Sequence, residues 1–333
     1  MPRRARKNKA EFATTHDHHP PKTMNPSLVH LGLDIAKATL AGHLQGQRLE
    51  WPNTPVGHAA LGARIAAAGQ PVQVICEATG SYGGAVVAAL QRAGVPVSVL
   101  QPARARQLAC GLGYLAKTDA LDAAALARIG ACLQPAPTPA RTPQQETLTA
   151  LVARRDQLVE LCRREKQHRE TTTERLALRD LGQSLAALEK RVAKLDGLIA
   201  AHLAAQSELG AKAARLQQAS GVGAVAASTL LAVLPELGQG TRARLTSLAG
   251  LAPRAWDSGA SRGQRHVYGG RPKARRILYL CALSAARHHP FLKTFYARLR
   301  TAGKAPKVAL TAVARKLLTY LHAALQNPAF TLA

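Results

Sequence analysis

The sequence predicts an α/β domain followed by a helical coiled-coil segment and a mainly α-helical, strongly basic C-terminal domain. Short apolar runs alternate with alanine-rich helical stretches in the first part of the chain. Leucines then recur at alternating spacings of four and three residues, and the last third holds 18 lysines and arginines against two acidic residues. Because 47% of the 333 residues are hydrophobic, the chain can form real cores. We therefore divide it into residues 1–27, 28–140, 141–212 and 213–333.

Residues 1–27 are predicted to be a disordered basic arm. They contain a cluster of lysines and arginines, then histidines and prolines, and almost no apolar residues that could form a core. Met24 is the only methionine besides Met1, which leaves two positions at which translation could begin.

Residues 28–140 alternate between strands and helices. The expected order is strand Leu28 to Leu40, a second strand run His43 to Glu50, helix Val56 to Ala68, strand Val72 to Cys76, helix Gly83 to Ala93, strand Val95 to Leu100, and helical segments through Cys132. This alternation predicts a largely parallel sheet, with a site near the carboxyl ends of its strands. The prolines of residues 134–139 end the domain as a linker.

The middle segment carries a heptad pattern. Its apolar positions are Leu181, Leu185, Leu188, Val192, Leu195 and Ile199. Leu148, Leu151, Leu158 and Cys162 indicate an earlier helix. An antiparallel hairpin within one chain and a coiled coil with another subunit fit this pattern equally well.

Acidic residues are scarce in the α/β domain, and four of its five stand at unusual positions. Asp34 interrupts an apolar run and Glu77 ends another, where a carboxylate costs several kcal/mol unless it is paired or binds a metal. Asp119 and Asp122 share one helical face, one turn apart. A capped first helical turn would explain that pair alone. The scarcity favours a metal site, and oxygen ligands suit Mg²⁺, with Mn²⁺ as an alternative.

The formal charge of +26 indicates a polyanionic partner, for which nucleic acid is the first candidate. No apolar run approaches the roughly 20 residues that span a bilayer, and the N-terminus lacks a signal-peptide core. We expect a cytoplasmic protein that does not act at a membrane. The five scattered cysteines predict reduced core thiols and no zinc site.

A second group of candidate residues lies in the basic C-terminal domain. Ser258 precedes a glycine and lies among arginines that could neutralise charge on an attacked phosphate, with Ser261 as a second candidate nucleophile. The alternative is a phosphate-binding loop whose serine only donates a hydrogen bond. Gly221 and Gly223 resemble the turn of a helix-hairpin-helix. The predicted nucleic-acid contacts are Gly221, Gly223, Arg254, Arg262, Arg265, Arg271, Lys273, Arg275 and Arg276.

These residues closely resemble the DEDD-type insertion-sequence transposases, the family of bridge-RNA-guided serine recombinases with a RuvC-like N-terminal domain. The resemblance spans nearly everything after the arm. Its motifs are Gly32-Leu33-Asp34-Ile35-Ala36-Lys37, Cys76-Glu77-Ala78-Thr79-Gly80, Lys117-Thr118-Asp119-Ala120-Leu121-Asp122-Ala123, Leu248-Ala249-Gly250-Leu251-Ala252-Pro253, Asp257-Ser258-Gly259 and Arg276-Ile277-Leu278-Tyr279. The order of the carboxylates is also that of the ribonuclease-H-like fold.

The resemblance implies a specific division of labour. The four carboxylates would bind Mg²⁺, Ser258 would form a transient phosphoserine bond to DNA, and an element-encoded guide RNA would pair with DNA. We also expect a dimer or tetramer, associated with the bacterial nucleoid when bound to DNA. A RuvC-like junction nuclease without a covalent intermediate is the alternative enzyme, and a chromatin or RNA-binding protein is the non-catalytic one.

Overall fold

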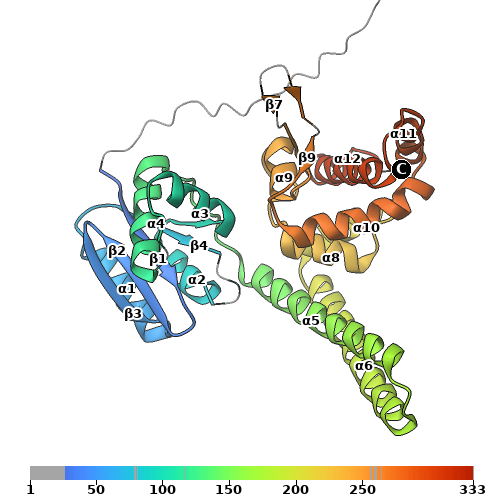
Figure 1. Cartoon of the computed structure of the whole chain (residues 1–333), viewed down its shortest axis with the longest axis horizontal. Coiled ribbons are helices and arrows are strands. Elements are labelled where there is room, and N and C mark those ends of the chain that lie inside the picture. The colour runs from blue at the N-terminus through green and yellow to red at the C-terminus, as the bar shows by residue number, and fades with distance from the viewer. Residues whose placement is uncertain are drawn as a thin grey trace, which may run out of the picture. The chain divides into compact units, whose positions relative to one another are not determined.

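The computed structural model describes residues 27–332 apart from seven single positions. These are Thr79, Ser81, Lys117, Trp256, Gly259, Ala260 and Gln264. The predicted basic arm therefore lies outside the described residues, except for Ser27. The chain forms two compact units that divide between Ala140 and Arg141 (Figure 1).

The first unit contains a five-stranded sheet in the order β3-β2-β1-β4-β5. Its strands are β1 (Val29–Ile35), β2 (Thr39–Leu44), β3 (Gln47–Pro52), β4 (Val72–Glu77) and β5 (Val97–Leu100). β1, β2 and β3 are antiparallel, whereas β1, β4 and β5 are parallel. The expectation of a largely parallel sheet is therefore wrong for β2 and β3. The mixed sheet is consistent with a ribonuclease-H-like domain.

Short connections explain the antiparallel strands. The run predicted as one strand from Leu28 to Leu40 breaks after Ile35 and resumes at Thr39, too soon for a parallel crossover. The second predicted run contains a two-residue turn at Gln45 and Gly46, whose φ angles of 49° and 84° are typical of a tight β-hairpin. The sequence therefore held three strands where we predicted two.

Helices cover both faces of this sheet (Figure 1). α1 (Pro55–Ala66) and α2 (Gly84–Arg92) pack over the side chains of Leu31, Leu33 and Val74. On the other face, α3 (Pro102–Gly111) and α4 (Asp119–Leu133) enclose a second core cluster that includes Ile75, Leu100, Leu126 and Ile129. Alternate residues of each strand therefore point to different helices.

The proline-containing linker after α4 lies against β5. The Oγ of Ser98 donates to the carbonyl of Pro135 at 2.9 Å, and Gln73 Nε2 donates to the same carbonyl at 2.6 Å. The Thr138 amide donates to Val97 at 2.7 Å, and the Val99 amide to the Thr138 hydroxyl at 3.0 Å. These bonds satisfy the edge of β5, which would otherwise expose unpaired backbone groups.

The second unit begins with two long antiparallel helices, α5 (Pro143–Thr171) and α6 (Arg175–Ala204), which pack on each other (Figure 1). The heptad residues Leu185 and Ile199 are buried, and Arg155 pairs with Asp196 across the two helices at 2.5 Å. The heptad seam is therefore used within one chain, as in the first of the two predicted alternatives.

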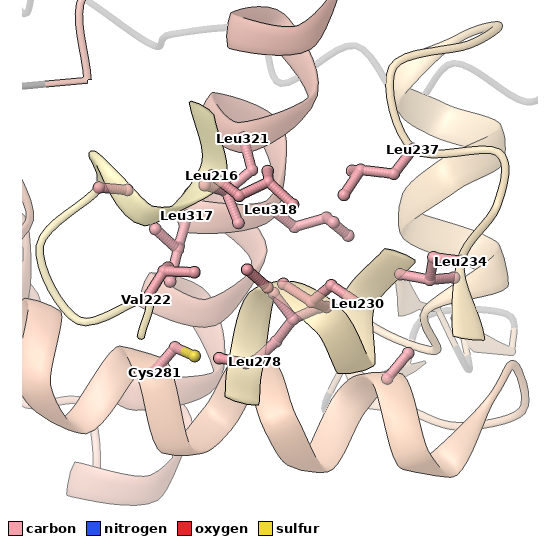
Figure 2. Packing of buried hydrophobic residues seen from close by; sticks show 14 of the residues in the cluster. Leu216, Val222, Leu230, Leu234, Leu237, Leu278, Cys281, Leu317, Leu318 and Leu321 are labelled. Carbon is pink, nitrogen blue, oxygen red and sulfur yellow. The ribbon is translucent and has the colours of Figure 1, made fainter. Parts of the chain in front are cut away.

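Among its described residues, the second unit contains six further helices. They are α7 (Ser207–Gln217), α8 (Ala224–Val233), α9 (Arg242–Leu248), α10 (Pro272–His288), α11 (Pro290–Thr301) and α12 (Pro306–Gln326). Figure 2 shows leucines from α7, α8, α10 and α12 converging in one core. Leu230, Leu278 and Leu318 are fully buried there. The expectation of a mainly α-helical C-terminal domain is confirmed in this unit.

One long and apolar helix lies in the second unit. α12 is 21 residues long and reaches a mean hydropathy of 1.2, enough in length and composition to cross a membrane. Its apolar residues, among them Leu310, Val313 and Leu321, instead face the core of the second unit. A core helix surrounded by other helices is apolar for the same reason as a membrane helix, because few of its side chains meet water.

The cysteines are free, but they are not all core thiols as predicted. Cys76, Cys162 and Cys281 are buried, whereas Cys110 and Cys132 are exposed. Burial raises the pKa of the Cys76 thiol to about 12, with a smaller contribution from the charge of Glu77, and burial raises that of Cys281 to about 11.

Candidate active site and nucleic-acid interface

Asp34 and Glu77 lie next to each other at the carboxyl ends of two parallel strands. Leu33 of β1 is level with Cys76 of β4, so Asp34 and Glu77, which follow them, are neighbours across the sheet. Glu77 is the last residue of β4, as the sequence predicted. Neighbouring strands lie about 4.8 Å apart and their side chains at one level share a face. Both side chains are half-buried and point to the face that α4 covers.

The first turn of α4 brings the other two carboxylates to the same end of the sheet. A Cβ built on Gly32 of β1 would lie 1.9 Å from the Ala123 carbonyl, and one on Gly130 would lie 2.8 Å from His30. α4 therefore runs antiparallel to β1, with Gly130 over the start of the strand. Asp119, the first helical residue, lies toward the end of β1 that carries Asp34.

Local hydrogen bonds fix the loops that carry these residues. The Thr118 side chain caps α4 by accepting from the Leu121 amide at 3.3 Å. Arg106 of α3 donates to the carbonyl of Leu115 at 2.8 Å and so holds the loop before that cap. Asn53 donates to Ala36 at 2.9 Å and to Tyr82 at 3.3 Å, which ties the turn after Asp34 to the loop after Glu77.

The four carboxylates offer the oxygen donors that a hard divalent cation prefers. Two are adjacent across β1 and β4, and two are one helical turn apart on α4. Among the described residues, however, no group of three or more histidine, cysteine or acidic side chains is close enough to hold one ion. The structure thus brings the predicted ligands to one end of the sheet but not into a closed ligand set.

Ser258 lies on a small β-hairpin of the second unit. β7 (Asp257–Ser258) pairs with β8 (Ser261–Arg262), and Ser258 and Ser261 are partners in the register. The hairpin is closed by Asp257, whose Oδ1 accepts from the Gly263 amide at 3.1 Å and from Arg265 at 2.6 Å. The Arg265 guanidinium thus has a local role in addition to the phosphate contact predicted for it.

Below it, β6 (Pro253–Arg254) pairs with β9 (His266–Val267). The Arg254 guanidinium lies 4.8 Å from the centre of the Tyr268 ring, a cation–π contact. Tyr268 is 47% exposed and was not among the predicted site residues. An exposed aromatic ring in a chain with only 4% aromatic residues was the available signal.

Two predicted arginines hold the base of this loop. Arg275 donates to the carbonyls of Gly269 at 2.8 Å and Gly250 at 3.3 Å. A Cβ on Gly250 would lie 2.3 Å from the Gly269 carbonyl, so the two segments touch through their backbones. Arg271 makes two hydrogen bonds of 2.6 Å with Glu236. Burial raises the pKa of Glu236, but the hydrogen bonds and charge of Arg271 outweigh this and hold that pKa below its usual value.

The remaining predicted contacts have different surroundings. Lys273 pairs with Asp156 of α5, and Arg276 is exposed on α10. Gly221 has a φ of +94°, and a Cβ there would lie 2.7 Å from the Cys281 carbonyl, so this glycine permits close packing of the turn on α10. Gly223 is the N-cap of α8, and nothing lies within 4 Å of the position that a Cβ would take there.

Comparison with known proteins gives two matches to family models, which together span most of the chain. Residues 31–174 match a family described as transposase, and residues 213–297 match one described as transposase IS116/IS110/IS902 family. The chain belongs to the IS110 family of transposases. It is therefore a DNA transposase or recombinase, and the DEDD-type family that matches residues 31–174 suggests dependence on a divalent metal.

Individual proteins similar to this IS110-family transposase support the same assignment. The pilin gene-inverting proteins of Moraxella lacunata and Moraxella bovis are each 28% identical to it, over 90% of this chain and 97% of theirs. An insertion element IS110 protein of 43.6 kDa from Streptomyces coelicolor is 36% identical over 115 residues, which are 33% of this chain and 28% of that protein.

Proposed function

We propose that this transposase cuts and rejoins DNA strands with a divalent-metal site formed by Asp34, Glu77, Asp119 and Asp122 and with Ser258 as the nucleophile. The observation that carries the proposal is the gathering of all four carboxylates at one end of one sheet face, in a domain with a single other acidic residue, Glu50. Mg²⁺ is the proposed ion because the ligands are oxygens, and Mn²⁺ would serve similarly.

The proposed reaction is a phosphoryl transfer to serine. The Ser258 hydroxyl loses its proton and forms an O–P bond, while the phosphorus–oxygen bond to the sugar breaks and the released sugar oxygen takes up a proton. A bound divalent ion would stabilise the charge on the attacked phosphate. Attack by another strand's hydroxyl on the phosphoserine reverses the sequence and releases the joined product.

The basic residues divide into two groups in this proposal. Arg254, Arg262 and Arg276 contact phosphates, with Arg265 joining them from the closed hairpin. Arg271, Lys273 and Arg275 keep their bonds to Glu236, Asp156 and the Gly250 and Gly269 carbonyls, and so hold the shape of the loop that presents Ser258. Gly223 offers the open N-terminus of α8 to a further phosphate.

We further propose that an element-encoded guide RNA pairs with donor and target DNA, and that a dimer or tetramer acts on the nucleoid in the cytoplasm. The +26 charge supports a second polyanionic partner in addition to DNA. Sequencing the RNA that copurifies with the protein tests this directly. Full-length similarity to the pilin gene-inverting proteins favours DNA inversion as a second outcome of the same strand exchange.

The test is a denaturing gel of labelled DNA incubated with protein, copurified RNA and Mg²⁺. Wild type should give cleaved strands and a protease-sensitive protein–DNA adduct, and excess chelator should abolish both. Ser258→Ala should lose both while Ser261→Ala keeps them. Asp122→Asn should lose cleavage but retain binding, because it removes a charge without changing the fold.

The same gel distinguishes the alternatives. Undiminished cleavage by Ser258→Ala, with no adduct in the wild type, would leave a metal-dependent junction nuclease. If only Ser261→Ala lost the adduct, Ser261 and not Ser258 would be identified as the nucleophile. Steep salt-dependent binding without any cleavage would indicate a nucleic-acid-binding protein with a degenerate site.

A further inference from the structure

A groove of about 730 Å³ lies between the β2–β3 hairpin and the first turn of α4. Its lining includes His43, Gly46, Arg48, Thr118, Asp119 and Leu121. One wall thus contains a proposed metal ligand, Asp119, and the other contains residues to which no role has been given above. The groove belongs entirely to the first unit.

The sheet register explains why His43 and Arg48 line this groove. His43 of β2 is level with Gly32 of β1 and with Arg48 of β3, so the three positions share one face of the sheet. Gly32 lies directly under α4, and the same row continues through His43 of β2, on which α4 also packs, to Arg48 of β3. A histidine and an arginine therefore stand beside the helix turn that carries Asp119.

The bonding of these two side chains indicates a ligand. The Nδ1 atom of His43 is buried and has no hydrogen-bond partner in the described part of the chain, a state that costs about 1–3 kcal/mol. Arg48 is exposed and forms no ion pair with any described residue.

The charges of the groove select the class of ligand. Arg48 and His43 attract an anion, whereas Asp119 at the other wall repels one unless a cation lies between them. A small free anion in the groove would be attracted by Arg48 and His43 and repelled by Asp119 at the same time. An extended phosphodiester strand separates them, because one phosphate can lie at Arg48 while the next lies near the carboxylates and their metal.

We propose that this groove binds the DNA strand next to the phosphate that is cut, with Arg48 and His43 contacting its phosphate oxygens. The proposal rests on the proposed function, since it takes the carboxylates as the cutting site. Arg48 and His43 are positioning residues: they act on the strand beside the reacting phosphate and not on the reacting atoms.

Photo-crosslinking of the full-length protein tests the location. Leu121→p-benzoylphenylalanine places a reactive group in the groove and leaves Arg48 and His43 unchanged. Val56→p-benzoylphenylalanine is the matched control, because Val56 is 78% exposed on α1, which packs on the opposite sheet face. Labelled DNA should crosslink to the first variant and not to the second. Equal crosslinking of both, none to either, or crosslinking of RNA in place of DNA would overturn the proposal.

DNA binding measured in the presence of chelator tests the proposed contact between Arg48 and a phosphate when no divalent ion is bound. Arg48→Ala should lower the slope of log K against log salt by about 0.7 to 0.9, the value of one lost phosphate contact. Arg92→Ala, which removes an exposed arginine from α2 on the other face, should leave the slope unchanged. An unchanged slope in Arg48→Ala refutes the contact.

The two proposals can fail separately. Crosslinking at position 121 with no metal-dependent cleavage would refute the carboxylate chemistry and leave the groove. Normal cleavage without crosslinking would refute the groove and leave the chemistry.

Discussion

Replacing Gly32 by alanine should displace the helix that carries Asp119 and Asp122, two of the proposed metal ligands, away from the sheet. The added Cβ would lie 1.9 Å from the Ala123 carbonyl and 2.4 Å from the Ala127 amide, whereas real Cβ contacts are essentially never below 3.0 Å. Both obstacles are helix backbone, which cannot rotate away as a side chain can. α4 must therefore move away from β1 by about 1.1 Å or more, which is the difference between the 3.0 Å limit and the 1.9 Å distance to the Ala123 carbonyl.

Two effects follow from this displacement. Overpacking of this kind costs about 1–3 kcal/mol of unfolding free energy. Because Asp119 and Asp122 are on the displaced helix while Asp34 stays on the sheet, the ligands separate, and a 1 Å misplacement can lower a rate by about 100-fold. We expect both losses in the same variant.

Urea unfolding followed by Trp51 fluorescence measures the loss of unfolding free energy in the first compact unit, where the substitution lies. Trp51 is on β3, and the only other tryptophan, Trp256, is replaced by phenylalanine in all proteins compared. With an m value of about 2 kcal/mol/M, the midpoint should fall by about 0.5–1.5 M. Gly62→Ala is the matched control, because nothing lies within 4 Å of a Cβ at that position of α1. It should be neutral or stabilise by up to about 1 kcal/mol.

The same proteins test cleavage on the denaturing gel. If Gly32→Ala unfolded at the parent midpoint, or cut DNA at the parent rate, the close contact between β1 and α4 would not be what positions the carboxylates. A loss of cleavage in Gly62→Ala would likewise refute the reasoning, since that residue touches neither α4 nor the ligands.

Three further outcomes follow from the second unit. Arg271→Ala should cost about 1–3 kcal/mol and weaken adduct formation, because Glu236 is left half-buried without its partner; urea unfolding and the gel measure these. The folded pKa of Glu236 is below its ordinary value, so the stabilisation from this pair is complete above the ordinary pKa and is lost as pH falls through the lowered one. Glu236→Gln should therefore make the free energy of unfolding less dependent on pH in the acid range, as measured by urea unfolding at several pH values. Leu185→Asp buries a charge between α5 and α6 and should lower helicity by circular dichroism, whereas Lys190→Asp, at an exposed position, should not.

The sequence alone was sufficient for local features of the first unit. The three-residue spacing of Asp119 and Asp122 puts them on one helical face whatever surrounds the helix, and the apolar run before Glu77 ends at the strand's last residue. Thr118 before this helix is likewise a local capping signal. These features depend on the periodicity of helices and strands, which is a property of the chain over a few residues.

Strand pairing could not be read in the same way. Residues 28–40 contain no proline that would mark the end of a strand after Ile35. Only the register shows that Asp34 and Glu77 are neighbours and that His43 and Arg48 continue a row from Gly32. Pairing joins segments far apart in the sequence, so neither residue type nor spacing determines it.

The partners of the arginines were decided only by the tertiary structure. From the sequence, Arg254, Arg271 and Arg276 are equivalent basic residues beside Ser258. In the fold, Arg271 meets Glu236, 35 residues earlier, Arg254 stacks on Tyr268, and Arg276 remains exposed. The sequence determined that this region is cationic, because charge is a sum over residues. Which cation holds the loop and which is presented to DNA depends on what the folded chain brings within hydrogen-bonding distance, and that is a property of packing.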